Sequence, residues 1–122
     1  QILELLAGLQ QRLNVSVILI THDLGVVAQL CHRVAVMYAG RIVEVGDADQ
    51  VFASPVHPYT KGLIRATPRL DVVTERMVSI DGVPPDLISP SKGCAFFPRC
   101  DQAKKACSRM QALIGLGVDR YV

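Results

Sequence analysis

The stretch VSVILITHDL, residues 15–24, is the segment from which the fold can be inferred. Its first six residues are apolar except for Ser16, are rich in Val and Ile, and show no alternation, which is typical of a strand buried on both faces of a parallel sheet. Residues just past the carboxyl end of such a strand line the ligand crevice of an open α/β sheet. Thr21, His22 and Asp23 hold that place, before a predicted helix whose N-terminus favours anions. The residues alone leave two interpretations open: His22 faces a ligand, or Thr21 or Asp23 only caps the helix and His22 is a surface residue.

The composition is that of an ordinary folded chain of about one domain. Half of the 122 residues are hydrophobic and 20% are charged. The net charge of +2 is too even to argue for nucleic acid or a membrane surface on electrostatics. No apolar run approaches the roughly 20 residues of a membrane span, and no signal peptide is visible. The chain opens QILELL without an initiator Met, so we expect it to be a piece of a longer protein.

The segments around the 15–24 stretch predict an alternation of helices and strands. Apolar residues recur at helical spacing over 2–13 and predict an amphipathic helix, which Asn14 can end in the left-handed conformation. A second helix is predicted over 24–31. Two β-rich runs, 33–38 and 41–45, are separated by Ala-Gly and predict a hairpin.

Two shorter helices are predicted after the hairpin. Asp47, followed three residues later by Gln50, has the form of a helix start. His57-Pro58 opens another helix, because proline suits the first helical position, and Thr67-Pro68 ends it. The chain then becomes charged, irregular and rich in Pro and Gly. We therefore predict two parts, residues 1–68 and residues 69–122.

Residues 20–46, ITHDLGVVAQLCHRVAVMYAGRIVEVG, resemble the region after the Walker B strand in the ATP-binding subunit of an ABC transporter. The continuation HPYTKGL, residues 57–63, is similar to the C-terminal extension of the dipeptide, oligopeptide and nickel importers. The resemblance covers essentially the whole chain. It implies an α/β fold: a partial ABC-type P-loop NTPase domain (helix, buried strand, helix, antiparallel hairpin) followed by a small irregular extension that contains cysteines.

The resemblance also implies a function and a role for one histidine. In the family, the histidine of the Thr-His-Asp loop contacts the γ-phosphate of ATP and helps to hold the attacking water, so His22 is the expected catalytic and nucleotide-binding residue. Asp23 is expected to orient the loop. The whole protein would be an ABC-type ATPase that couples ATP hydrolysis to uptake of a peptide, with nickel as the other substrate of the family. Its expected partners are a second ATP-binding subunit, two membrane permease subunits and, indirectly, a substrate-binding protein, with no nucleic acid. Its expected place is the cytoplasmic face of the cell membrane, as a peripheral protein.

Three motifs of that family are missing from these 122 residues. The sequence holds no G-x-x-x-x-G-K-[ST] phosphate loop, no Leu-Ser-Gly-Gly signature and no apolar strand ending in Asp-Glu. In the family all three lie upstream of a position equivalent to Gln1. ATP and Mg²⁺ are therefore expected only in the full-length protein, and this fragment alone is predicted to be inactive.

Three of the four cysteines form a cluster in sequence, Cys94, Cys100 and Cys107, with the spacing C-x₅-C-x₆-C. This matches neither the common zinc spacings nor that of ferredoxins. Without a secretory signal a reducing location is the default, which favours metal-bound or free thiols over disulfides. On spacing alone, unrelated buried thiols remain an equal alternative. Cys31 is interpreted as a small core residue.

The tail GCAFFPRC, residues 93–100, is similar to that of the dipeptide-importer ATPases, in which four cysteines hold a [4Fe–4S] cluster. Cys94, Cys100 and Cys107 match the first three ligands, and the fourth would lie beyond Val122. Three thiolates leave a labile or partial cluster, a zinc ion or no metal as alternatives. Five bases surround the thiolates in sequence: Lys92, Arg99, Lys104, Lys105 and Arg109. The competing function for the whole chain is a self-standing metal-binding interaction module without catalysis.

Overall fold

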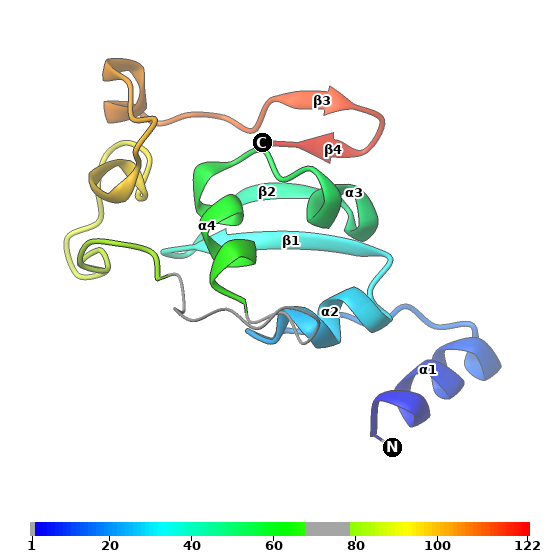
Figure 1. Cartoon of the computed structure of the whole chain (residues 1–122). Coiled ribbons are helices and arrows are strands. Elements are labelled where there is room, and N and C mark those ends of the chain that lie inside the picture. The colour runs from blue at the N-terminus through cyan, green and yellow to red at the C-terminus, as the bar shows by residue number, and fades with distance from the viewer. Residues whose placement is uncertain (1, 68–78) are drawn as a thin grey trace.

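A four-stranded antiparallel sheet forms the centre of the computed structural model, which describes residues 2–67 and 79–122. The strand order is β1-β2-β4-β3, and Figure 1 shows the helices α3 and α4 lying against the β1–β2 pair. The strands are β1 (Arg33–Tyr38), β2 (Arg41–Asp47), β3 (Gly115–Gly117) and β4 (Arg120–Tyr121). The last two strands join the sheet through one pairing, Val45 with Tyr121.

The predicted hairpin is confirmed. β1 pairs with β2 from Arg33 opposite Asp47 to Tyr38 opposite Arg41, with an irregularity between Val36 and Met37. The two turn residues between the strands, at positions 39 and 40, have φ of 49° and 75°. A two-residue hairpin turn of this kind needs positive φ at both positions.

The helices after the 15–24 stretch also follow the prediction closely. They are α2 (Leu24–Leu30), α3 (Ala48–Ala53) and α4 (Pro58–Ala66). Asp47 caps α3, since its Oδ1 accepts from Gln50 N at 3.3 Å. His57 caps α4, with Pro58 at its first position, and the helix ends before Thr67 as predicted.

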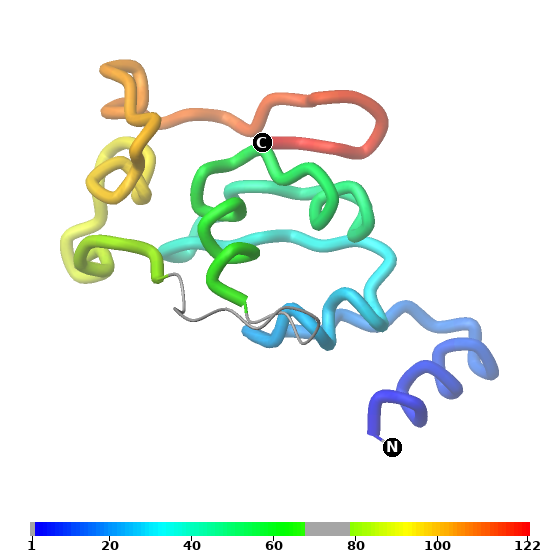
Figure 2. Tube along the Cα trace, in the orientation of Figure 1, coloured from blue at the N-terminus to red at the C-terminus, as the bar shows by residue number. Residues whose placement is uncertain are grey.

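The predicted buried strand at residues 15–20 is wrong for this structure. The segment is extended, but it pairs with no strand among the described residues, and Ile18 and Ile20 are 91% and 95% exposed. A strand buried on both faces needs parallel neighbours on both sides, and the sheet of the described residues is antiparallel throughout. The helix before it, α1 (Ile2–Leu13), forms as predicted and ends at Asn14 with φ 49°, yet it buries none of its residues. Figure 2 shows α1 at the periphery of the molecule.

The core is small and joins early and late segments of the chain. Tyr38 of β1 packs against Tyr59 of α4 with ring centroids 4.4 Å apart, and edge-on against Phe96 at 5.3 Å. Phe96 precedes two short 3₁₀ turns, η1 (Phe97–Arg99) and η2 (Lys105–Ser108). The buried apolar residues are Val27, Val36, Tyr38, Ala48, Val51 and Phe96.

These contacts cross the position at which we predicted a boundary between two parts. Pro68 and the residues up to 78 lie outside the described residues, so the division into 1–68 and 69–122 stays a prediction. Among the helices of the described residues, none is long and apolar enough to cross a membrane.

Candidate functional site

The Thr-His-Asp turn leads directly into α2. Asp23 is the N-cap: its Oδ1 accepts from Gly25 N at 2.9 Å and from Val26 N at 3.1 Å. Its own N–H donates to Thr21 Oγ1 at 3.0 Å. These bonds hold the backbone on both sides of His22, whose side chain is exposed to solvent. The turn therefore leaves an imidazole available to a ligand, while the carboxylate beside it is occupied by capping the helix.

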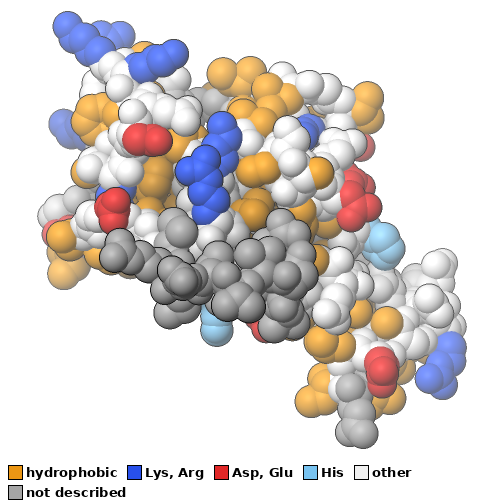
Figure 3. Space-filling model, in the orientation of Figure 1, with side chains coloured by type: hydrophobic (Ala, Val, Ile, Leu, Met, Phe, Trp, Pro, Cys, Tyr) orange, Lys and Arg blue, Asp and Glu red, His pale blue; other side chains and the backbone are white. Residues whose placement is uncertain are grey.

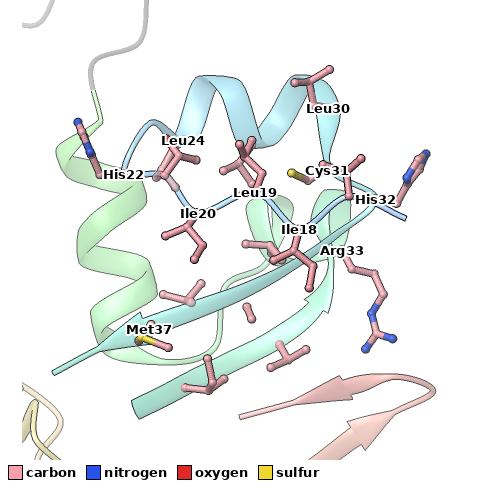
Figure 4. Close-up of a pocket in the computed structure, with 18 of the residues that line it drawn as sticks. Ile18, Leu19, Ile20, His22, Leu24, Leu30, Cys31, His32, Arg33 and Met37 are labelled. Atoms are coloured by element: carbon pink, nitrogen blue, oxygen red, sulfur yellow. The ribbon is translucent and has the colours of Figure 1, made fainter. Parts of the chain in front are cut away.

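An open, largely apolar groove of about 880 Å³ runs beside this turn. Its walls come from the extended segment 16–22, α2 and β1, with further side chains from α1, β2 and α4. Figure 4 shows His22 and His32 at opposite ends of the labelled lining, with Ile18 and Ile20 between them. The apolar face predicted for a buried strand is thus present, but it lines an open groove.

The cysteine segment folds so that its two ends meet. Cys94 N donates to Cys107 O at 2.9 Å. A Cβ added at Gly93 would lie 2.4 Å from Cys107 O, so only glycine fits there without moving the backbone. All three cysteines of the cluster are half-buried. Burial is the main reason that the pKa of Cys100 is raised, and the nearby Cys94 and Cys107 add to it.

The predicted metal site does not fit this arrangement. Among residues 2–67 and 79–122, no group of three or more His, Cys, Asp or Glu side chains is placed to hold a metal ion. Cys94 and Cys107 are joined through their backbones, whereas the backbone of Cys100 bonds locally with Phe97 O and Ala103 N. The [4Fe–4S] cluster is accordingly not supported.

Of the five bases near the cysteines in sequence, Arg99 makes structural hydrogen bonds and the other four are exposed. Arg99 donates to the backbone oxygens of Asp81 and Ile80, at 2.8 and 2.6 Å, and to Tyr38 Oη at 3.2 Å. It therefore ties the tail to the hairpin. Lys92, Lys104, Lys105 and Arg109 are exposed. Figure 3 shows Lys and Arg side chains gathered at the corner of the molecule where η2 lies.

Two polar residues of this region were missed in the sequence. Glu44 of β2 has no exposure, and its carboxylate accepts from Val56 N and His57 N, both at 2.9 Å, and from Arg120 Nη2 at 3.3 Å. Arg120 also donates to Ser54 O. The sequence did contain a signal for the Glu44 contacts. Glu44 is an acidic residue at an inward position of a strand, and a buried charge there needs a partner of opposite charge or hydrogen-bond donors.

His57 is the second such residue, since the sequence predicted for it only a place at the start of a helix. It is half-buried, its Nδ1 accepts from Tyr59 N at 3.1 Å, and its Nε2 lies 4.0 Å from Cys94 Sγ. Desolvation lowers the pKa of His57, and the nearby Glu44 carboxylate offsets part of that effect. Tyr59 packs in the core, where its ring is tilted against those of Tyr38 and Phe96 at centroid distances of 4.4 and 5.5 Å.

Comparisons with known proteins point to one kind of transporter. The family model described as "Oligopeptide/dipeptide transporter, C-terminal region" matches residues 43–107. The dipeptide transport ATP-binding protein DppD of Bacillus subtilis is 54% identical over 110 residues, which are 90% of this chain and 33% of that protein. The oligopeptide transport ATP-binding protein OppD of Escherichia coli is 53% identical over 108 residues (88% and 32%). DppD of E. coli is 44% identical over 119 residues (98% and 36%). The chain thus spans about a third of the length of these relatives.

Proposed function

Because this chain belongs to the family of oligopeptide/dipeptide transporter C-terminal regions, we propose that it is the C-terminal part of the ATP-binding subunit of a peptide importer. The observation that carries the proposal is the identity of about half over nearly the whole chain with proteins named as dipeptide and oligopeptide transport ATP-binding proteins. In that setting the whole protein hydrolyses ATP with Mg²⁺ and drives uptake of a peptide.

Its partners in this proposal are a second ATP-binding subunit and two membrane permease subunits, with a substrate-binding protein acting indirectly. The protein would sit at the cytoplasmic face of the membrane. The competing hypothesis, a self-standing metal-binding module, is not supported, since the relatives are transport ATP-binding proteins and the described residues assemble no metal group.

Within this function, His22 is the proposed contact to the γ-phosphate. Three observations support the proposal: the imidazole is exposed, it follows an extended apolar segment, and its backbone is held by the Thr21 and Asp23 hydrogen bonds. A ring nitrogen that donates to a phosphate oxygen would stabilise the charge that develops there, and phosphoryl transfer depends mainly on such positioning and stabilisation.

A chimera tests this proposal. Replacing the matching third of B. subtilis DppD with this chain supplies the motifs that the 122 residues lack. We expect the purified chimera to hydrolyse ATP, and His22→Ala to lower kcat by about 100- to 1,000-fold, the usual cost of removing one stabilising donor.

The matched control is His32→Ala, since His32 is another exposed histidine on a loop next to α2. It should retain the kcat of the parent chimera. An inactive but folded chimera would overturn the assignment of the chain, whereas an active chimera that tolerates His22→Ala would overturn only the role of His22.

A further inference from the structure

We propose that Arg120 couples two segments that are far apart in sequence, the strand pair at 113–122 and the turn at 54–57 between α3 and α4, so that the two open and close as one unit. The strand pair, hereafter the strap, comprises β3, β4 and the residues that flank them. This assigns a conformational device to a residue outside the proposed contact with ATP. It goes beyond the proposed transport function and does not depend on ATP hydrolysis.

The strap is a unit of its own that is weakly attached to the sheet. Its ends are joined by two backbone hydrogen bonds, Ile114 N to Val122 O at 2.7 Å and Val122 N to Ile114 O at 3.0 Å. Its pairing with β2 is the single pair of Val45 with Tyr121, and all of β3 is exposed. Because an isolated pair of strands is only marginally stable in water, docking of the strap depends on its side-chain contacts.

Arg120 makes the contact that reaches deepest into the molecule. Its side chain is only 14% exposed, and its Nη2 donates to Glu44 Oε1 at 3.3 Å and to Ser54 O. A Cβ added at Gly46 would lie 3.3 Å from Arg120 Cγ and 3.1 Å from Val51 Cγ2. The missing side chain at position 46 therefore leaves the space through which the guanidinium reaches the buried carboxylate.

The same carboxylate holds the turn between α3 and α4. Glu44 is fully buried and accepts from Val56 N and His57 N, both at 2.9 Å. Figure 1 shows the end of β4 beside the segment that joins α3 and α4. When Arg120 leaves, Glu44 loses its ion-pair partner among the described residues, and a buried charge without a partner is costly unless its surroundings rearrange to admit water. Undocking of the strap therefore loosens the turn, and opening of the turn favours undocking, because coupling is reciprocal.

The docked arrangement is only partly satisfied. Arg120 Nε is buried and has no hydrogen-bond partner among the described residues. A buried donor without an acceptor opposes docking, because the same N–H would bond water in the undocked state. The favourable contacts of Nη2 and the unfavourable burial of Nε thus oppose each other. Local opening of the strap is therefore accessible without unfolding of the β1–β2 pair.

The experiment measures native-state amide hydrogen exchange by NMR on the isotope-labelled 122-residue chain. The first variant is Arg120→Met, which keeps the apolar stem and removes the guanidinium. We expect the turn amides of Val56 and His57 to exchange about 10- to 100-fold faster, in keeping with the loss of a hydrogen bond between charged groups. The strap amides of Ile114 and Val122 should accelerate by a similar factor. The amides that pair β1 with β2 should change by less than about 3-fold, because the opening is local.

Two further variants accompany this one. Arg33→Met is the matched control: Arg33 Nη2 donates to Asp119 O of the strap at 3.2 Å from an exposed position, where water replaces a lost bond readily. It should leave the turn amides at the parent rate. Arg120→Lys keeps the charge on Glu44 paired, so it also serves if Arg120→Met does not fold. Because lysine lacks the guanidinium fork, we expect the turn and the strap to exchange about 3- to 10-fold faster together.

Three outcomes overturn the proposal. In the first, the strap amides accelerate while the turn amides keep the parent rate, which would show that the two segments are not coupled. In the second, the amides between β1 and β2 accelerate as much as the others, which would show that Arg120 stabilises the whole fold without a separate opening. In the third, neither segment changes. If Arg120→Met does not fold, the same three criteria are applied to Arg120→Lys.

Discussion

At the scale of single residues, Glu44 is the group on which separate segments converge. Its buried carboxylate receives two backbone N–H groups from the turn before α4 and a guanidinium N–H from β4. Glu44→Ala would remove the acceptor of both backbone N–H groups at a fully buried position and leave Arg120 Nη2 with Ser54 O alone. We expect a loss of about 3–5 kcal/mol in the free energy of unfolding, the usual cost of breaking a buried pair from one side. Urea denaturation followed by circular dichroism measures it.

The matched control for this substitution is Asp47→Ala. Asp47 ends the same strand, is exposed and makes a single capping bond to Gln50 N, so its removal should cost about 1 kcal/mol. An equal loss in the two variants would show that Glu44 is not the anchor that its contacts indicate.

His57 predicts a dependence of stability on pH. Its pKa is lowered from the ordinary value of 6.5 in the folded chain, mainly by desolvation. Between the folded and ordinary values the unfolded chain binds more protons, so the contribution of His57 is fully present above pH 6.5 and is lost as the pH falls below it. Protonation would also remove the Nδ1 acceptor of the helix cap. We expect the urea midpoint of the parent to fall more steeply below pH 6.5 than that of His57→Asn; parallel curves would contradict this.

At the scale of elements, the sequence correctly predicted the hairpin and the helix caps, which are formed by residues close to one another in the chain. The hairpin needed only two β-rich runs and a turn with positive φ, and the caps at Asp47 and His57 are made within a few residues. The strand predicted at 15–20 failed for the opposite reason, since a strand exists only when another strand pairs with it. The Cys94–His57 contact was beyond sequence reasoning because 37 residues separate the two side chains.

The exposed segment at 15–20 leads to a prediction for the element itself. The double variant I18S/I20S removes two large apolar side chains that are 91% and 95% exposed. We expect the dye anilinonaphthalene sulfonate to bind more weakly and self-association to fall in sedimentation experiments, because an exposed apolar patch promotes both. The free energy of unfolding should change by less than about 0.5 kcal/mol.

Val27→Ser provides the contrast for this variant. Val27 is an apolar residue of the adjacent α2 and is only 7% exposed, so its replacement should lower the unfolding free energy by at least about 1.5 kcal/mol. If the double variant at Ile18 and Ile20 loses as much, the segment is packed more firmly in solution than the structure indicates.

At the scale of the whole molecule, the phosphate contact proposed for His22 lacks, within these 122 residues, the phosphate loop that would hold a nucleotide. His22 is held at the end of an extended segment, but the 122 residues contain no phosphate loop. One exposed imidazole supplies about one hydrogen bond, worth roughly 1–3 kcal/mol even when charge assisted. Binding at 1 mM requires about 4 kcal/mol of free energy, so this chain alone falls short.

We therefore expect isothermal titration of the 122-residue chain with Mg²⁺-ATP to show no binding heat up to millimolar concentration. The DppD chimera described above is the positive control: DppD is named as an ATP-binding protein, and we expect the chimera to bind ATP under the same conditions. His22→Ala in the isolated chain should leave the flat titration unchanged. Stoichiometric binding of ATP to the isolated chain would mean that the groove beside His22 forms a nucleotide site by itself. The role proposed for His22 within a longer ATPase would then have to be abandoned, since the groups that bind the phosphates of ATP would lie within these 122 residues.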